Sequence, residues 1–165
     1  MSSLIISITR YCVIGAGVAL AYYMYFHWRD ARIALEIILL SCVAFNGLIS
    51  FVSHVIFHKS DAKRLGMETA NPGFQYEVGF ANLAIGLAAL VAFFGAWGVI
   101  ANTIIVLCYT LYILQSVIFH LVRYTTGENR SPGYIWGSIF FGALYAGNML
   151  FFVIAAMRQE HLAPF

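Results

Sequence analysis

The sequence predicts an all-α integral membrane protein with a single domain, residues 1–165. The chain is 62% hydrophobic and only 10% charged, whereas soluble domains carry about 25% charged residues. A soluble fold of this length could not hide so much apolar surface from water. The charges lie mainly at the ends of long apolar runs, where a bilayer tolerates them. The net charge of +2 is too small to favour nucleic-acid binding.

Five apolar runs are long enough to cross a bilayer as helices. A spanning helix needs about 20 predominantly apolar residues, and a helix satisfies its backbone groups internally where water is absent. The first run is expected to be a retained span rather than a cleaved signal peptide, because Arg10 lies within it and no small-residue cleavage site follows. The predicted spans cover residues 4–26, 33–57, 78–97, 99–122 and 134–157.

Two kinds of connection separate the predicted spans. Residues 27–32 and 95–98 are short enough for tight turns, so the third and fourth spans should form a close hairpin. Residues 58–76 form the longest polar loop, in which Ser60 and Gly66 are expected to start and end one helical turn. A second polar loop follows the fourth span.

The distribution of Lys and Arg predicts which end of the bundle faces the cytoplasm. The side that holds the N-terminus and both polar loops carries six basic residues: Arg10, Lys59, Lys63, Arg64, Arg123 and Arg130. The opposite side carries three: Arg29, Arg32 and Arg158. Because cytoplasmic segments carry the excess of basic residues, we expect the N-terminus inside and the C-terminus outside.

The last four spans are predicted to be two copies of one helix–loop–helix hairpin. Val-Ile-Phe-His closes the second span at His58 and the fourth span at His120. A polar loop follows each time, and then a Pro-Gly-aromatic sequence at 72–74 and at 132–134. Both copies start from the same face, so they would be parallel repeats about an axis along the membrane normal. The N-terminal span is then an addition to the two repeated hairpins.

A cluster of three histidines and one glutamate is predicted at a single membrane face: His54, His58, Glu77 and His120. Histidines at i and i+4 share one face of a helix and can share a metal. The four side chains would complete a site for Zn, Fe or Cu, or two of the histidines would hold a haem iron. Two alternatives stay open. The histidines can be interfacial anchors, with Glu77 at the positive end of a helix dipole, or the cluster can form a proton or ion pathway.

Polar and small residues within the spans form two further sets. The polar set is Asn46, Ser50, Ser53, Asn82, Gln115 and Asn148. Such side chains usually bond across helices inside a bundle, so structural contacts are expected; a substrate or ion path is the alternative, too sparsely polar for a wide aqueous pore. The small residues predict close helix contacts, with another span or another subunit, at Gly79, Gly86, Gly133, Gly137 and Gly142.

The stretch NPGFQYEVGFANLAIG, residues 71–86, resembles the signature of a family of small multi-pass prokaryotic membrane proteins of unknown function. The matching positions are Pro72, Phe74, Gln75, Glu77, Val78, Gly79, Phe80, Ala81, Asn82, Leu83 and Gly86. The resemblance implies a span that opens at this block, in the cytoplasmic (inner) membrane of a prokaryote. It points to Glu77 and Asn82 and implies no reaction.

Three functional classes follow from these patterns. The first expectation is an interaction or accessory subunit of a membrane complex or homo-oligomer, because the chain is small and its loops are short. The alternatives are a metal- or haem-binding membrane protein that uses the His/Glu cluster, and a small proton-coupled transporter. The expected partners are the lipid bilayer and other membrane subunits or a second copy of the chain. No nucleophile–base motif appears, and the sequence leaves open whether the protein is an enzyme.

Overall fold

The computed structural model describes residues 3–65, 71–127 and 134–160, in which five helical spans are long and apolar enough to cross a membrane. Three spans are single helices: α1 (Ser3–Trp28), α5 (Gly73–Phe94) and α6 (Val99–Thr125). The second and fifth contain π-helical segments: α2 (Ala31–Ile38), η1 (Leu39–Ala44), α3 (Phe45–Phe51) and η2 (Val52–Ile56), then η3 (Ile135–Phe140) and α8 (Phe141–Gln159). The predicted all-α membrane fold with five spans is confirmed.

The ends of the spans differ from the predicted ends where polar residues continue a helix. The third span begins at Gly73 rather than at residue 78. The side-chain oxygen of Asn71 accepts a hydrogen bond from the main-chain N–H of Gly73 (3.0 Å), and the main-chain N–H of Tyr76 donates to the Pro72 carbonyl (3.1 Å). The Asn-Pro-Gly sequence therefore starts this helix. The short helix α4 (His58–Leu65) begins two residues before Ser60, whose hydroxyl donates to the Phe57 carbonyl instead of capping the helix.

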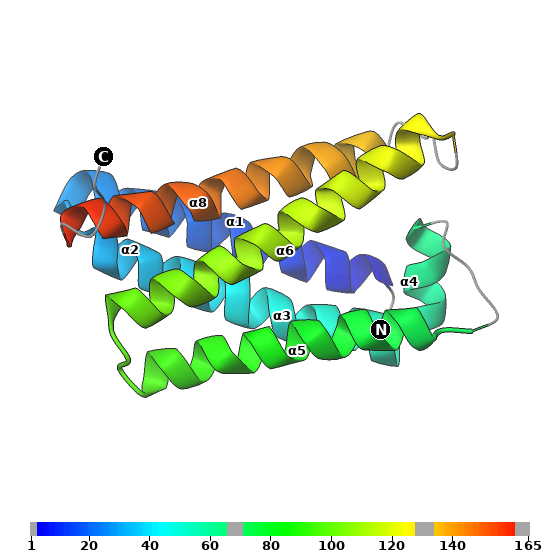
Figure 1. The fold of residues 1–165 in the computed structure, drawn as a ribbon, viewed down its shortest axis with the longest axis horizontal. Helices are drawn as coiled ribbons and strands as arrows, with labels where there is room; N and C mark the ends of the chain where they lie inside the picture. The colour runs from blue at the N-terminus through cyan, green and yellow to red at the C-terminus, as the bar shows by residue number, and fades with distance from the viewer. Residues whose placement is uncertain (1–2, 66–70, 128–133, 161–165) are drawn as a thin grey trace.

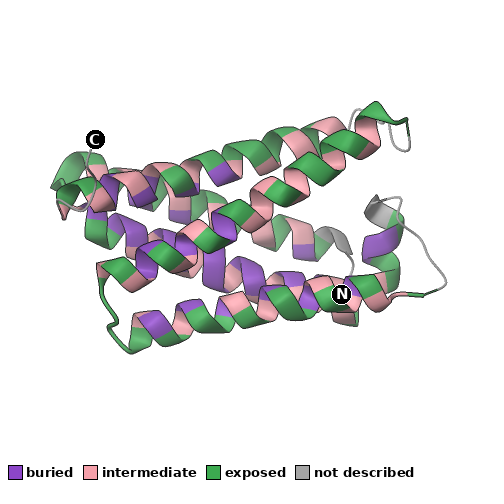
Figure 2. Ribbon diagram, viewed as in Figure 1, coloured by how far each residue is buried: buried purple, intermediate pink, exposed green. Residues whose placement is uncertain are grey.

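The second span is the buried centre of the bundle. Half of its most apolar window is buried, more than in any other span. In Figure 2, buried residues recur along α2, η1 and α3. The outer spans instead expose large apolar side chains such as Leu87, Val91, Ile104 and Leu111. Apolar side chains exposed on the outside of the bundle are suited to contact with lipid rather than with water.

Close packing of α3 against α5 depends on two glycines. A Cβ added to Gly47 would lie 2.5 Å from the carbonyl oxygen of Asn82 and 2.9 Å from the Cα of Gly86. Both atoms belong to the backbone of α5, so they cannot move aside as a side chain would. Gly86 in turn faces the carbonyl oxygen of Ala44, where an added Cβ would lie at 3.1 Å. Gly47 and Gly86 thus lie against each other and allow α3 and α5 to approach closely.

The bundle is tied together at one end and separates toward the other (Figure 1). At the end that holds the C-terminal part of α8, Tyr22 donates to Asn148 (2.8 Å), and the rings of Tyr25 and Phe151 meet at 5.3 Å. The main chain of Ala31 also donates to the side chain of Gln159 (2.7 Å). In Figure 1, α6 leaves α5 and runs obliquely to the start of the fifth span, and the α3–α5 pair diverges from the α6–α8 pair toward the end that holds α4.

Candidate functional site

A cavity of about 730 Å³ lies among the spans, on the side of the bundle where they separate. Its volume falls within the range of roughly 300–1,000 Å³ that is typical of small-molecule sites. Apolar side chains form most of its wall, among them Ile14, Val78, Ile113, Val117 and Phe141. The cavity therefore offers a small molecule a largely apolar chamber inside the membrane-spanning part of the protein.

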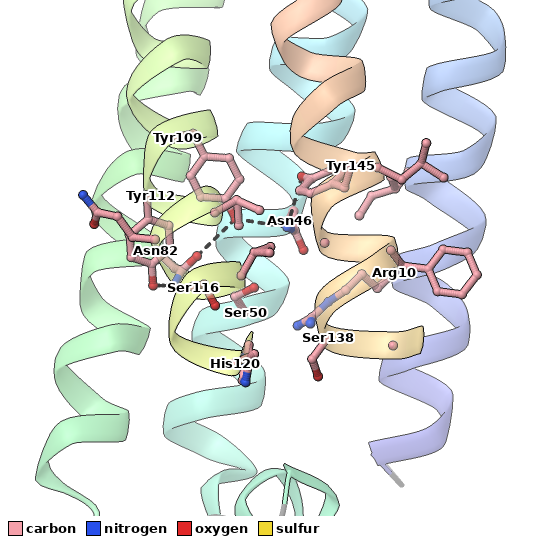
Figure 3. A pocket seen from close by; sticks show the side chains of 18 of the residues that line it. Arg10, Asn46, Ser50, Asn82, Tyr109, Tyr112, Ser116, His120, Ser138 and Tyr145 are labelled. Atoms are coloured by element: carbon pink, nitrogen blue, oxygen red, sulfur yellow. Dashed lines mark hydrogen bonds between the residues drawn. The ribbon is translucent and has the colours of Figure 1, made fainter. Parts of the chain in front are cut away.

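The deep wall of the cavity is a hydrogen-bond network centred on Asn46 (Figure 3). Tyr109 donates its hydroxyl to Oδ1 of Asn82 (3.1 Å), and Tyr145 donates its hydroxyl to the carbonyl of Cys42. Both phenol protons are used in these bonds, so the amide nitrogen of Asn46 is the donor to both hydroxyls, at 3.0 and 3.1 Å. This arrangement fixes which way the Asn46 amide points.

One atom of this network lacks a partner. Oδ1 of Asn46 is buried and accepts no hydrogen bond from the described part of the chain, although the residue is only 6% exposed and lines the cavity. A buried carbonyl oxygen that makes no hydrogen bond costs on the order of 1–3 kcal/mol. A donor supplied from the cavity would recover that cost.

Asn82 links the network to the neighbouring helices. Its amide nitrogen donates to the carbonyl of Val78 and to the hydroxyl of Tyr112, both at 2.8 Å. Together with Asn46, Tyr109 and Tyr145, the bonds join the second, third, fourth and fifth spans. Asn46 and Asn82 therefore bond across helices within the bundle, and the same side chains also line the cavity.

A second set of polar side chains lies between the Asn46 network and the end that holds α4 (Figure 3). Arg10 reaches from α1 into the space between the helices, with its Nε and Nη2 atoms buried. Arg10 lies seven residues after Ser3, the first residue of α1, which places its Cα about 10 Å along the helix. Ser50, Ser116 and Ser138 face the same space from three different spans (Figure 3).

Two of the three histidines of the predicted cluster line the cavity, and the third does not. His54 and His120 both line the cavity, and Nδ1 of His120 lies 2.6 Å from the hydroxyl of Tyr134. His58 does not line the cavity; its Nδ1 lies 3.2 Å from the Val55 carbonyl.

The backbone between His54 and His58 explains this division. The chain leaves the helical conformation at Phe57 (φ −107°, ψ 26°), where η2 ends and α4 begins. The two histidines are therefore on different helical segments and do not share one face.

The four residues predicted as metal or haem ligands do not form one centre. Glu77 is exposed and does not line the cavity. Among residues 3–65, 71–127 and 134–160, no three His, Cys, Asp or Glu side chains are placed to hold a metal ion. The cluster predicted from the sequence thus contributes two histidines to the cavity, and its other two members lie elsewhere.

Asp61 is a buried acid that the sequence pattern did not single out. Its Oδ2 lies 2.7 Å from Nδ1 of His54, and its Oδ1 accepts a bond from the hydroxyl of Ser53 (3.0 Å). The Asp61 side chain is 1% exposed beneath α4, and that of His54 is 19% exposed. The contact fixes the ring of His54 at the cavity and docks α4 onto η2.

The remaining predicted residues have varied surroundings. The side chain of Asn148 accepts a hydrogen bond from the hydroxyl of Tyr22. Gln115 is exposed and lines the cavity. Added Cβ atoms at Gly79 and Gly142 would meet Val55 and Val117 at 2.5 and 2.8 Å, so both glycines allow close helix contacts. Gly137 has no neighbouring atom of the described chain within 4 Å of such a Cβ, and it lines the cavity. Gly133 lies outside the described residues.

Comparison with known proteins gives one match. A protein-family model described as a family of unknown function (DUF6790) matches residues 2–163. No curated protein and no solved structure matches the chain.

Proposed function

The chain belongs to the DUF6790 family of unknown function, and we propose that it binds a small amphiphilic molecule drawn from the membrane. The single observation that carries this proposal is the cavity of about 730 Å³, which is mainly apolar and lies among the spans. A molecule that enters such a site from lipid exchanges one apolar surrounding for another. Specific binding therefore depends on the polar side chains that the cavity presents.

The polar end of the cavity indicates a ligand with a polar head. Oδ1 of Asn46 accepts no bond from the described chain, so a hydroxyl group or a water molecule held in the cavity would supply its hydrogen bond. Apolar side chains of the same cavity, such as Ile113, Val117 and Phe141, would contact the chain of the same ligand. Two π-helical segments border the site, since η2 carries His54 and η3 carries Ser138; such segments are frequent at functional sites.

We place this activity in the inner membrane of a prokaryote, with the end that holds α4 toward the cytoplasm. The excess of Lys and Arg at that end supports this orientation. The roles of accessory subunit, homo-oligomer and proton-coupled transporter stay predictions from the sequence. Ligand binding is the function that the cavity among the spans favours directly.

Filling the cavity is expected to weaken this binding. Phenylalanine at Gly137 or at Gly15 would occupy the cavity, because both glycines line it and have open space at the Cβ position. The protein in lipid nanodiscs would be photolabelled with ten-carbon chains that carry a diazirine, as the alcohol and as the acid. We expect saturable labelling of the unmodified protein, and binding weaker by about tenfold or more in Gly137→Phe and Gly15→Phe.

Gly147→Phe is the matched control. Gly147 also has open space at the Cβ position, is exposed on α8 and does not line the cavity. This variant should keep the labelling of the unmodified protein. Labelling by both probes that fails to saturate, or that is equal in all three variants, would overturn the proposed function.

A further inference from the structure

We infer that the ligand of this cavity carries an anionic headgroup, a carboxylate or a phosphate, on one apolar chain, and that Arg10 is the residue that selects it. The inference rests on the proposed function, because it names the class of molecule that the same cavity takes. It adds a charge requirement that an apolar cavity alone would not impose.

The charge of the cavity lining supports an anion. Arg10 contributes a guanidinium group with buried Nε and Nη2 atoms, and His54 and His120 contribute two imidazoles. No Asp or Glu is among the described residues that line the cavity. Asp61 approaches His54 on its Nδ1 side and is itself outside the lining. The described part of the lining therefore carries a net positive charge at every protonation state of its histidines.

Neutral donors accompany the cation. Ser50, Ser116 and Ser138 line the cavity, and their hydroxyls make no hydrogen bond with the part of the chain that the structure describes. Figure 3 shows these three side chains and Arg10 directed into one space from four different spans. A serine or threonine inside a membrane helix ordinarily bonds a carbonyl of its own helix, as Ser41 and Thr110 do here. Three hydroxyls left to donate beside a guanidinium are suited to the several oxygens of a carboxylate or phosphate.

The position of Arg10 indicates an amphiphile rather than a free anion. Arg10 lies about 10 Å along α1, with Tyr11 and Ile14 beside it on the cavity wall. Ile113, Val117 and Phe141 line the same cavity as this polar group. A headgroup at Arg10 therefore places an attached chain against an apolar wall, whereas a small anion would leave that wall without a partner.

The test compares headgroups on the same chain. Decanoate, decyl phosphate and decanol would compete with the photoreactive ten-carbon acid for the protein in zwitterionic nanodiscs, with acetate and inorganic phosphate as chainless competitors. We expect the two anionic chains to compete about tenfold better than decanol, and the chainless anions to compete only at far higher concentration. Equal competition by decanol would overturn the inference while leaving the proposed function standing. If acetate or phosphate competes as strongly as decanoate and decyl phosphate, the claim that the ligand is an amphiphile would be overturned.

Variants of Arg10 assign the selectivity to one residue. In Arg10→Gln the preference for anion over alcohol should fall to about one, and Arg10→Lys should keep most of the preference. The preference is the ratio of anion binding to alcohol binding, measured within each variant. A general loss of binding lowers both values and leaves this ratio unchanged. Lys59→Gln, which removes an exposed charge at the same end, should leave the ratio unchanged. A preference that survives in Arg10→Gln or falls in Lys59→Gln would overturn the assignment to Arg10.

Discussion

Gly47→Ala is expected to lower the free energy of unfolding by about 1–3 kcal/mol, the usual cost of overpacking a close-packed site. The added methyl group would lie 2.5 Å from the Asn82 carbonyl oxygen and 3.0 Å from the Gly86 backbone nitrogen. The atoms in its way are backbone atoms of α5, so α3 and α5 must separate. Separation would also disturb Asn46 and Asn82, which lie on these two helices and join the same network. Unfolding by SDS titration in mixed micelles measures the change.

Gly147→Ala is the control for the intrinsic effect of the substitution. Alanine is favoured over glycine inside a helix by roughly 0.5–1 kcal/mol, and Gly147 has nothing within 4 Å of the added carbon. This variant should be as stable as the unmodified protein or slightly more stable. If Gly47→Ala and Gly147→Ala shift stability by the same amount and in the same direction, the close contact between α3 and α5 is not formed.

His54→Ala is expected to destabilise the protein by about 2–3 kcal/mol, below the full cost of breaking a buried ion pair because the imidazole is partly exposed. The substitution removes the ring that faces Oδ2 of Asp61 at 2.7 Å. The carboxylate is 1% exposed beneath α4, where it also accepts a hydrogen bond from the hydroxyl of Ser53. We expect a lower unfolding free energy and faster hydrogen exchange of the α4 amides.

The double variant His54→Ala/Asp61→Asn separates charge burial from lost packing. Asparagine keeps the shape of Asp61 and removes its charge, so the double variant should recover about 1–2 kcal/mol relative to His54→Ala. Glu77→Gln removes an exposed carboxylate at the same end and should change neither stability nor exchange. A double variant no more stable than His54→Ala would show that the His54–Asp61 contact does not stabilise the docking of α4.

The number and order of the spans could be predicted from the sequence because hydropathy is a local property. A run of about 20 apolar residues has few alternatives to a spanning helix. The errors lie where polar residues continue a helix beyond the apolar run. α6 continues through His120 and Arg123 to Thr125, and α5 starts directly after Pro72. The π-helical segments have no sequence signal of this kind, and one of them ends the helix between His54 and His58.

The candidate site could be predicted only in part. Asn46, Ser50 and Asn82 stand out because polar side chains are rare in apolar spans, and all three line the cavity. Tyr109 and Tyr145 do not stand out, since a tyrosine in such a span is indistinguishable from a packing aromatic. The demand of a buried asparagine for hydrogen-bond partners is the signal that could have directed attention to them.

Asp61 and Arg10 were hidden by their position in the chain. Asp61 reads as a residue of a polar loop, and only the docking of α4 on η2 buries it. Arg10 reads as a residue that sets topology near the N-terminus, and only the separation of the spans turns it toward a cavity. Both depend on tertiary packing, which a pattern along one segment does not contain.

Mapping where a photoreactive ten-carbon acid attaches tests the central claim, that the spans enclose a ligand site, most directly. After labelling in nanodiscs, digestion and mass spectrometry would locate each adduct. We predict adducts on the cavity wall, at Ile113, Val117 and Phe141, and their loss in Gly137→Phe. Adducts confined to outward-facing residues such as Leu87, Val91 and Leu150, with the same yield in Gly137→Phe, would contradict it.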